Sequence, residues 1–107
     1  MDIKDKIAVI HNLMRVKKFT QAIINCHKLI KLNPNISYLY NLCGMAYQGN
    51  NQIEKSIESF NLALHYDSEN LAAMNNLANS YKALNQNDKA EEIYKKILKK
   101  DPNNIKC

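Results

Sequence analysis

Residues 37–70 read SYLYNLCGMAYQGNNQIEKSIESFNLALHYDSEN, and residues 71–104 read LAAMNNLANSYKALNQNDKAEEIYKKILKKDPNN. The two stretches align over 34 residues without a gap and are identical at nine positions. The identical pairs are Asn41/Asn75, Tyr47/Tyr81, Asn51/Asn85, Gln52/Gln86, Lys55/Lys89, Glu58/Glu92, Leu64/Leu98, Asp67/Asp101 and Asn70/Asn104. A fixed period of this length indicates a stacked repeat, in which one unit buries its apolar face only against the next.

Residues 3–36 are a third and more divergent copy. A shift of 34 residues aligns Pro34 with Ser68 and Pro102. The first copy shares Ile23 with the second copy, and Ala22, Lys28, Pro34 and Asn35 with the third. The sequence therefore predicts one domain over residues 1–107, with repeats at 3–36, 37–70 and 71–104 and a tail at 105–107.

The repeat resembles the tetratricopeptide repeat family, in which large apolar, Leu-Gly-like, Tyr, Ala, Phe and late Pro positions follow one another at fixed spacings. The second repeat matches with Tyr40, Cys43-Gly44, Tyr47, Ser56 and Phe60, and the third with Met74, Leu77-Ala78, Tyr81, Ala90, Tyr94 and Pro102. In the first repeat, Lys6 stands at the large apolar position and Ile10 at the small one, while Leu13, Ala22, Cys26 and Pro34 complete the pattern. The resemblance covers residues 3–104 and implies an all-α fold, a right-handed α-solenoid of three helix-turn-helix repeats with six antiparallel helices.

The pattern predicts helices at about 3–15, 19–32, 37–49, 53–66, 71–84 and 87–100. Small residues at Ala22, Gly44, Ser56, Ala78 and Ala90 permit two helices to cross closely. Asn50-Asn51 and Asn85 suit the left-handed backbone that commonly ends a helix, and Pro34 and Pro102 prevent a helix from continuing. We expect a core that includes Val9, Leu13, Cys43, Tyr47, Leu77 and Tyr81, with Cys26 and Cys43 as small buried hydrophobes.

The composition excludes several classes of protein. Hydrophobic residues make up 46% of the chain, with two Gly and two Pro, which fits neither a disordered chain nor a many-stranded sheet. The apolar run from Ile7 to Ile10 is too short for a signal peptide or a membrane span. Three cysteines without a CxxC spacing predict neither a disulfide framework nor a zinc site. We expect a cytoplasmic protein with no membrane, metal or cofactor contact.

No motif for catalysis is recognisable. The chain has no Gly-rich phosphate loop and no nucleophile elbow, and its acidic residues fall mainly on outer helix faces. His11, His27 and His65 fall at unrelated repeat positions without metal-ligand spacing. The sequence therefore predicts a protein that is not an enzyme.

The resemblance implies that the first helix of each repeat lines a concave groove that binds a peptide. Its residues would be Lys4, Ile7, His11, Arg15, Tyr38, Asn41, Leu42, Met45, Gln48, Asn75, Asn76, Asn79 and Lys82. Side-chain amides both donate and accept hydrogen bonds, which suits the backbone of an extended peptide. We expect Tyr38, Asn41, Met45, Asn76 and Asn79 to be the central contacts. Solvated polar faces are the alternative interpretation of these asparagines.

Family members that clamp the C-terminal carboxylate of heat-shock chaperones use Lys, Asn and Arg on the first helices. The matching positions here hold Ile7, His11, Leu42, Ala72 and Asn76. The clamp is therefore absent, and we do not expect binding of chaperone tails.

Charge is unevenly distributed along the chain. The formal net charge is +5, and the first repeat holds seven basic residues and one acidic residue, a net charge of +6. The second repeat has a net charge of −3 and the third of +2. This arrangement favours an acidic peptide or head-to-tail association. Arg15 is the single arginine and no aromatic residues are interleaved with Lys95, Lys96, Lys99, Lys100 and Lys106, so we do not expect nucleic-acid binding.

The C-terminal repeat leaves an apolar stripe at Ile93, Tyr94, Ile97 and Leu98 without a following helix. Repeat arrays need a cap at such an end. The sequence therefore predicts either self-association through this end or truncation from a longer protein. The leading function is an adaptor or scaffold that binds a peptide in the concave groove. The alternative is the N-terminal repeat region of a larger enzyme, such as a transferase.

Overall fold

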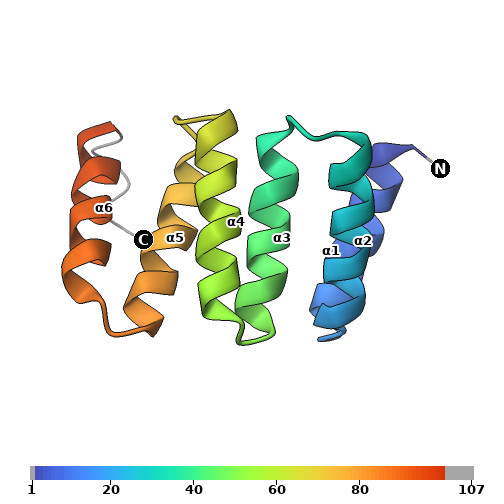
Figure 1. The fold of residues 1–107 in the computed structure, drawn as a ribbon, viewed down its shortest axis with the longest axis horizontal. Helices are drawn as coiled ribbons and strands as arrows, with labels where there is room; N and C mark the ends of the chain where they lie inside the picture. Colours follow the sequence, from blue (N-terminus) through green and yellow to red (C-terminus); the bar gives the residue numbers. More distant parts are fainter. Residues whose placement is uncertain (1, 101–107) are drawn as a thin grey trace.

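The computed structural model describes residues 2–100, and these residues fold into six helices. The helices are α1 (Ile3–Arg15), α2 (Phe19–Leu32), α3 (Ser37–Gly49), α4 (Ile53–Tyr66), α5 (Leu71–Ala83) and α6 (Asn87–Lys100). Consecutive helices lie side by side in chain order (Figure 1), in a body of 39 × 24 × 22 Å. The six helices fit three repeats, so the predicted α-solenoid is confirmed. The predicted bounds agree with the structure except that α5 ends one residue earlier.

The turn between the two helices of each repeat has the same backbone conformation. Lys17, Asn51 and Asn85 occupy equivalent positions and have φ angles of 64°, 61° and 62°. The prediction is confirmed for Asn51 and Asn85, whereas Asn50 has a φ of −86° and caps α3. Each turn is closed by a bond from the following residue, such as Gln52 N to Tyr47 O at 2.9 Å, in the manner of a Schellman motif.

Within the second repeat, α3 and α4 cross at Gly44 and Phe60. A Cβ atom placed on Gly44 would lie 2.6 Å from Cδ1 of Phe60, whose side chain is fully buried. Ser56 is also fully buried on α4. The prediction that small residues permit close crossing is confirmed here. In the first repeat the equivalent residue is Ile10, which is fully buried as well.

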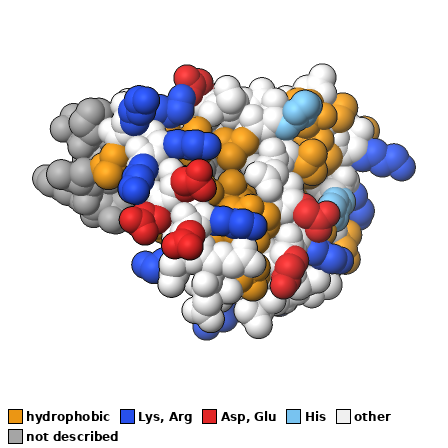
Figure 2. All heavy atoms as spheres, turned by 60° about the vertical axis from the view of Figure 1, so that its left-hand side comes forward, with side chains coloured by type: hydrophobic (Ala, Val, Ile, Leu, Met, Phe, Trp, Pro, Cys, Tyr) orange, Lys and Arg blue, Asp and Glu red, His pale blue; other side chains and the backbone are white. Residues whose placement is uncertain are grey.

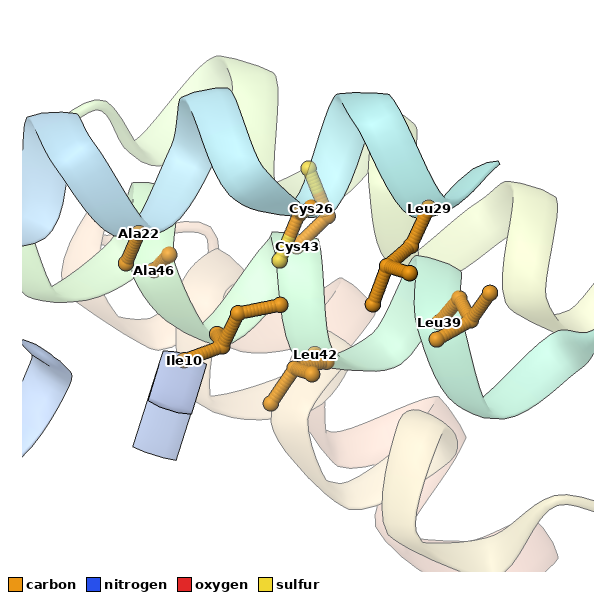
Figure 3. Close-up of a cluster of buried hydrophobic side chains, with 8 residues drawn as sticks. All are labelled: Ile10, Ala22, Cys26, Leu29, Leu39, Leu42, Cys43 and Ala46. Atoms are coloured by element: carbon orange, nitrogen blue, oxygen red, sulfur yellow. The ribbon is translucent and has the colours of Figure 1, made fainter. Parts of the chain in front are cut away.

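A core cluster of buried side chains joins α1, α2 and α3 (Figure 3). Its members are Ile10, Ala22, Cys26, Leu29, Leu39, Leu42, Cys43 and Ala46. Of the predicted core residues, Cys43 and Leu77 are buried, and Leu13, Tyr47 and Tyr81 are partly buried. The prediction is wrong for Val9, which is 38% exposed because it lines an open cavity between α1 and α2.

Cys26 and Cys43 are buried and free, on neighbouring helices. The hydrogen bond with Cys43 and burial raise the pKa of the Cys26 thiol. The hydrogen bond with Cys26 lowers the pKa of the Cys43 thiol, and burial opposes that shift. Both residues lie buried in the core cluster and pack as small apolar side chains, as expected.

The apolar stripe of the C-terminal helix is partly open, as the sequence predicted. Ile97 is buried, Ile93 and Tyr94 are partly buried, and Leu98 is exposed. Lys100 forms an ion pair with Glu69. Pro102 and the tail at 105–107 lie outside the described residues.

Introducing bulk at Gly44 tests the crossing. Gly44→Ala should reduce the free energy of unfolding by about 1–3 kcal/mol, because the new methyl group overlaps the fully buried Phe60 ring. Gly44→Val should abolish cooperative unfolding. Thermal and urea unfolding followed by circular dichroism measures both effects. A Gly44→Val protein with an unchanged melting curve would show that the repeat register is wrong.

Replacing Lys17 tests the shared turn. Lys17→Asn should raise the free energy of unfolding by about 1 kcal/mol or less, because asparagine adopts the left-handed conformation more readily than lysine. The reciprocal change, Asn51→Lys, should lower it by a similar amount in urea unfolding. A Lys17→Asn protein that is no more stable than the parent would contradict this account of the turn.

Candidate functional site

Side chains from all three repeats line one depression of about 580 Å³. The first helices α1, α3 and α5 contribute most of its wall, and α2 contributes one ring at its start. The lining residues are His11, Met14, Arg15, Phe19, Met45, Gln48, Gly49 and Asn76. The spacing of three and four residues along each first helix places these side chains on one face.

Five of the predicted groove residues meet in this depression. They are His11, Arg15, Met45, Gln48 and Asn76. Two more predicted residues are joined to its wall by hydrogen bonds: the Tyr38 hydroxyl lies 2.9 Å from Nε2 of His11, and Asn41 Oδ1 accepts from Asn76 Nδ2 at 3.0 Å.

The remaining predicted residues lie elsewhere. Leu42 is 1% exposed and belongs to the core cluster, so its side chain does not reach the groove surface. Asn79 accepts a hydrogen bond from the Tyr94 hydroxyl of α6, which directs its side chain toward that helix. Lys4, Ile7, Asn75 and Lys82 do not line the depression.

Met14, Phe19 and Gly49 also line the depression, although they were not predicted from the sequence. A Cβ atom on Gly49 would lie 2.6 Å from Cζ of Phe19, so the ring packs directly on the α3 backbone. One feature of the sequence could have indicated this contact. The chain has only two glycines, and the family pattern accounts for Gly44 but not for Gly49. Phe19 stands at the start of a second helix, and its equivalents Ile53 and Asn87 are not aromatic.

A chain of polar contacts runs beneath the depression. Gln48 Nε2 donates to Ser80 Oγ at 2.9 Å, and Ser80 Oγ lies 2.8 Å from Ser56 Oγ. Gln48 also reaches the Asn76 carbonyl at 3.4 Å. These bonds join α3, α4 and α5 and fix the orientation of the Gln48 amide, while the bond to Asn41 fixes that of the Asn76 amide. Among residues 2–100, no donor reaches Gln48 Oε1 or Asn76 Oδ1, and both oxygens are available to a ligand.

The charge in the depression is positive. Arg15 is exposed and donates from Nη2 to Asn12 Oδ1 at 2.9 Å, which helps to position the guanidinium. No carboxylate is among the lining residues. Met14, Phe19 and Met45 add apolar surface, and methionine adapts to irregular shapes. The depression therefore combines amide groups, one cation and adaptable apolar surface.

A different distribution of charge covers the C-terminal end. Figure 2, which brings the α5–α6 end of Figure 1 forward, shows lysine and carboxylate side chains interspersed with exposed apolar atoms. Lys95 and Glu91 form one such pair on α6 at 3.8 Å, with both side chains mostly exposed. An exposed pair of this kind contributes little to stability. None of the helices in residues 2–100 has the length and apolar character to cross a membrane.

Residues 47–106 match the sequence profile of the tetratricopeptide repeat. The chain belongs to the tetratricopeptide repeat family. It is 32% identical to the uncharacterised protein ycf37 of Porphyra purpurea, over 92% of this chain and 62% of that protein. In sequence the chain therefore spans less than two thirds of that relative.

Solved tetratricopeptide repeat structures share the fold. MamA from Desulfovibrio magneticus RS-1, solved from residue 41 to its end, superposes with a TM-score of 0.86 at 22% identity, covering 94% of this chain and 56% of the solved MamA chain. The first tetratricopeptide repeat domain of Spaghetti (RPAP3), solved with the HSP90 peptide SRMEEVD, has a TM-score of 0.87 at 19% identity. That match covers 98% of this chain and 86% of the Spaghetti domain. At these identities the likeness establishes the fold.

The contact between Gly49 and Phe19 is testable by a double-mutant cycle. Gly49→Ala alone should destabilise the protein, because the new Cβ displaces the Phe19 ring. In a Phe19→Ala background the same change should stabilise it by about 0.5–1 kcal/mol, the usual gain of alanine over glycine in a helix. Urea unfolding of the parent protein, the two single variants and the double variant measures whether Gly49→Ala lowers or raises the free energy of unfolding in each background. The same effect of Gly49→Ala in both backgrounds would contradict the contact.

Proposed function

We propose that this chain is an adaptor whose concave groove binds an extended peptide segment of another protein. The observation that carries the proposal is the depression shared by α1, α3 and α5, with its two available amide oxygens beside apolar side chains. The peptide backbone would donate to Asn76 Oδ1 and Gln48 Oε1. Hydrogen bonds from the backbone give affinity without selecting one sequence.

Side chains around the amides set the preference for a peptide. Met14, Phe19 and Met45 suit an apolar side chain, and the Arg15 guanidinium suits a carboxylate close to it. The proposal therefore favours a segment with one large apolar residue and an acidic residue nearby. Tetratricopeptide repeat domains solved with bound peptides, such as the first domain of Spaghetti, support this mode of binding.

The peptide differs from a chaperone tail. The positions that would clamp a terminal carboxylate hold Ile7, His11 and Leu42 on the first two repeats, and Leu42 is buried. A terminal carboxylate would meet no pair of lysines in this groove. The proposed ligand is therefore an internal segment of a partner.

Selection from a library of displayed peptides tests the proposal. A peptide selected on the parent protein should bind Arg15→Glu and Asn76→Ala roughly tenfold more weakly, a loss of about 1.4 kcal/mol each. Fluorescence anisotropy with the labelled peptide measures this loss. In the same assay, the SRMEEVD peptide should bind no more tightly with a free C-terminal carboxylate than with a C-terminal amide.

Two controls separate binding from stability. Asn61→Ala changes an exposed amide on α4 outside the depression and should leave affinity unchanged. Because Asn76→Ala also removes the donor to Asn41, its melting temperature is measured in parallel. If the selected peptides bind both groove variants as tightly as the parent protein, the binding surface lies elsewhere.

A further inference from the structure

The second repeat fills one space between its helices with an aromatic ring. Tyr40 of α3 stacks on Tyr66 of α4 with ring centroids 5.2 Å apart and an interplanar angle of 16°. The Tyr40 hydroxyl donates to the Pro34 carbonyl at 2.6 Å. Ile30 and Leu64 pack against the same cluster. The ring at this repeat position is therefore buried among apolar side chains.

The first repeat lacks this ring. The residues 34 positions earlier are Lys6 and Leu32, and Leu32 is 71% exposed. Between α1 and α2 the structure has a cavity of about 250 Å³. It is lined by Lys6, Val9, Ile10, Asn25, Lys28, Leu29 and Leu32, none of which lines the concave groove. The cavity thus lies where a large side chain at position 6 would otherwise pack.

The cavity has apolar walls with cations among its lining. Val9, Ile10, Leu29 and Leu32 supply the apolar surface, and Lys6 and Lys28 supply two ammonium groups with no carboxylate among the lining residues. The size suits a single aromatic ring, since apolar protein cavities of about 150 Å³ hold benzene. An uncharged helix laid over the site would bury the two ammonium groups without partners, which costs free energy.

We propose that this cavity is a second recognition site, which takes one aromatic side chain from an acidic peptide segment of a partner protein. The ring enters between α1 and α2, in the space that corresponds to Tyr40 in the second repeat. Carboxylates next to the aromatic residue pair with Lys6 and Lys28. The net charge of +6 on the first repeat draws an acidic segment to this end of the array. The site is separate from the concave groove and does not depend on the function proposed for the groove.

A designed peptide, acetyl-Glu-Glu-Tyr-Glu-Glu-amide with a fluorescent label, is the probe. Fluorescence anisotropy should show saturable binding that is lost when the Tyr is replaced by Ala, or when the four Glu are replaced by Gln. Amide shifts in NMR spectra of the labelled protein should cluster at Val9, Ile10, Leu29 and Leu32. Shifts that cluster instead at Met45, Gln48 and Asn76 would overturn the assignment of the site.

Lys6→Tyr is the decisive variant, because it supplies the missing ring from the chain itself. It should raise the melting temperature and weaken binding of the probe at least roughly tenfold. Lys6→Ala removes the same charge but leaves the cavity open, so it should bind with intermediate affinity. Lys4→Tyr is the matched control, with an added ring and a lost charge on an exposed residue, and should bind nearly as well as the parent protein.

Several outcomes would overturn the proposal. If the probe binds a stable Lys6→Tyr protein as tightly as the parent protein, the cavity is not its binding site. If the probe does not bind the parent protein, the proposal is also wrong. Light scattering addresses a second copy of the chain as the occupant. If the parent protein dimerises and Lys6→Tyr makes it monomeric, the cavity is a self-association site and the acidic-peptide proposal is wrong. Arg15→Glu, by contrast, should weaken the binding of groove peptides but change the affinity for the cavity probe by no more than about twofold. The proposals for the two sites are therefore tested independently.

Discussion

The close crossing of α3 over α4 is the contact on which the rest of the structure depends. Gly44 has no side chain, and the Phe60 ring occupies the space where one would lie. This places α3 within reach of α2, α4 and α5 together. Both the core cluster toward α1 and the Gln48 contacts toward α5 begin on this helix. The middle repeat therefore connects the first repeat to the third.

The sequence predicted the helices well because their ends are determined locally. Asn51 and Asn85 favour the left-handed turn, and Pro34 prevents α2 from continuing. Small residues at one repeat position then specify how the two helices of a repeat meet. Lys17 adopts the same turn without any local preference for it, at the repeat position that Asn51 and Asn85 occupy in the other two repeats. Its conformation was predictable only from the repeat register.

The groove was harder to predict than the helices. The position of a residue along a helix predicts the direction of its side chain. It does not predict which side chains of neighbouring helices cover it or bond to it. Leu42 lies on the expected stripe, yet it is buried in the core cluster that also contains Ile10 of α1. Asn79 also lies on the stripe, but the long Tyr94 side chain reaches it from α6. Phe19 enters the groove from a second helix, which no pattern confined to first helices includes.

The shared hydroxyl contact between Ser56 and Ser80 has a consequence for how the array opens. It is buried, and it couples the second and third repeats through Gln48. The first repeat has an open cavity and a lysine in a left-handed turn. The free energy needed to unfold one segment locally is lower where the segment has fewer buried contacts. Amide hydrogens of α1 should therefore exchange with solvent through detachment of that helix alone, while those of α3 to α5 exchange only when the whole array unfolds.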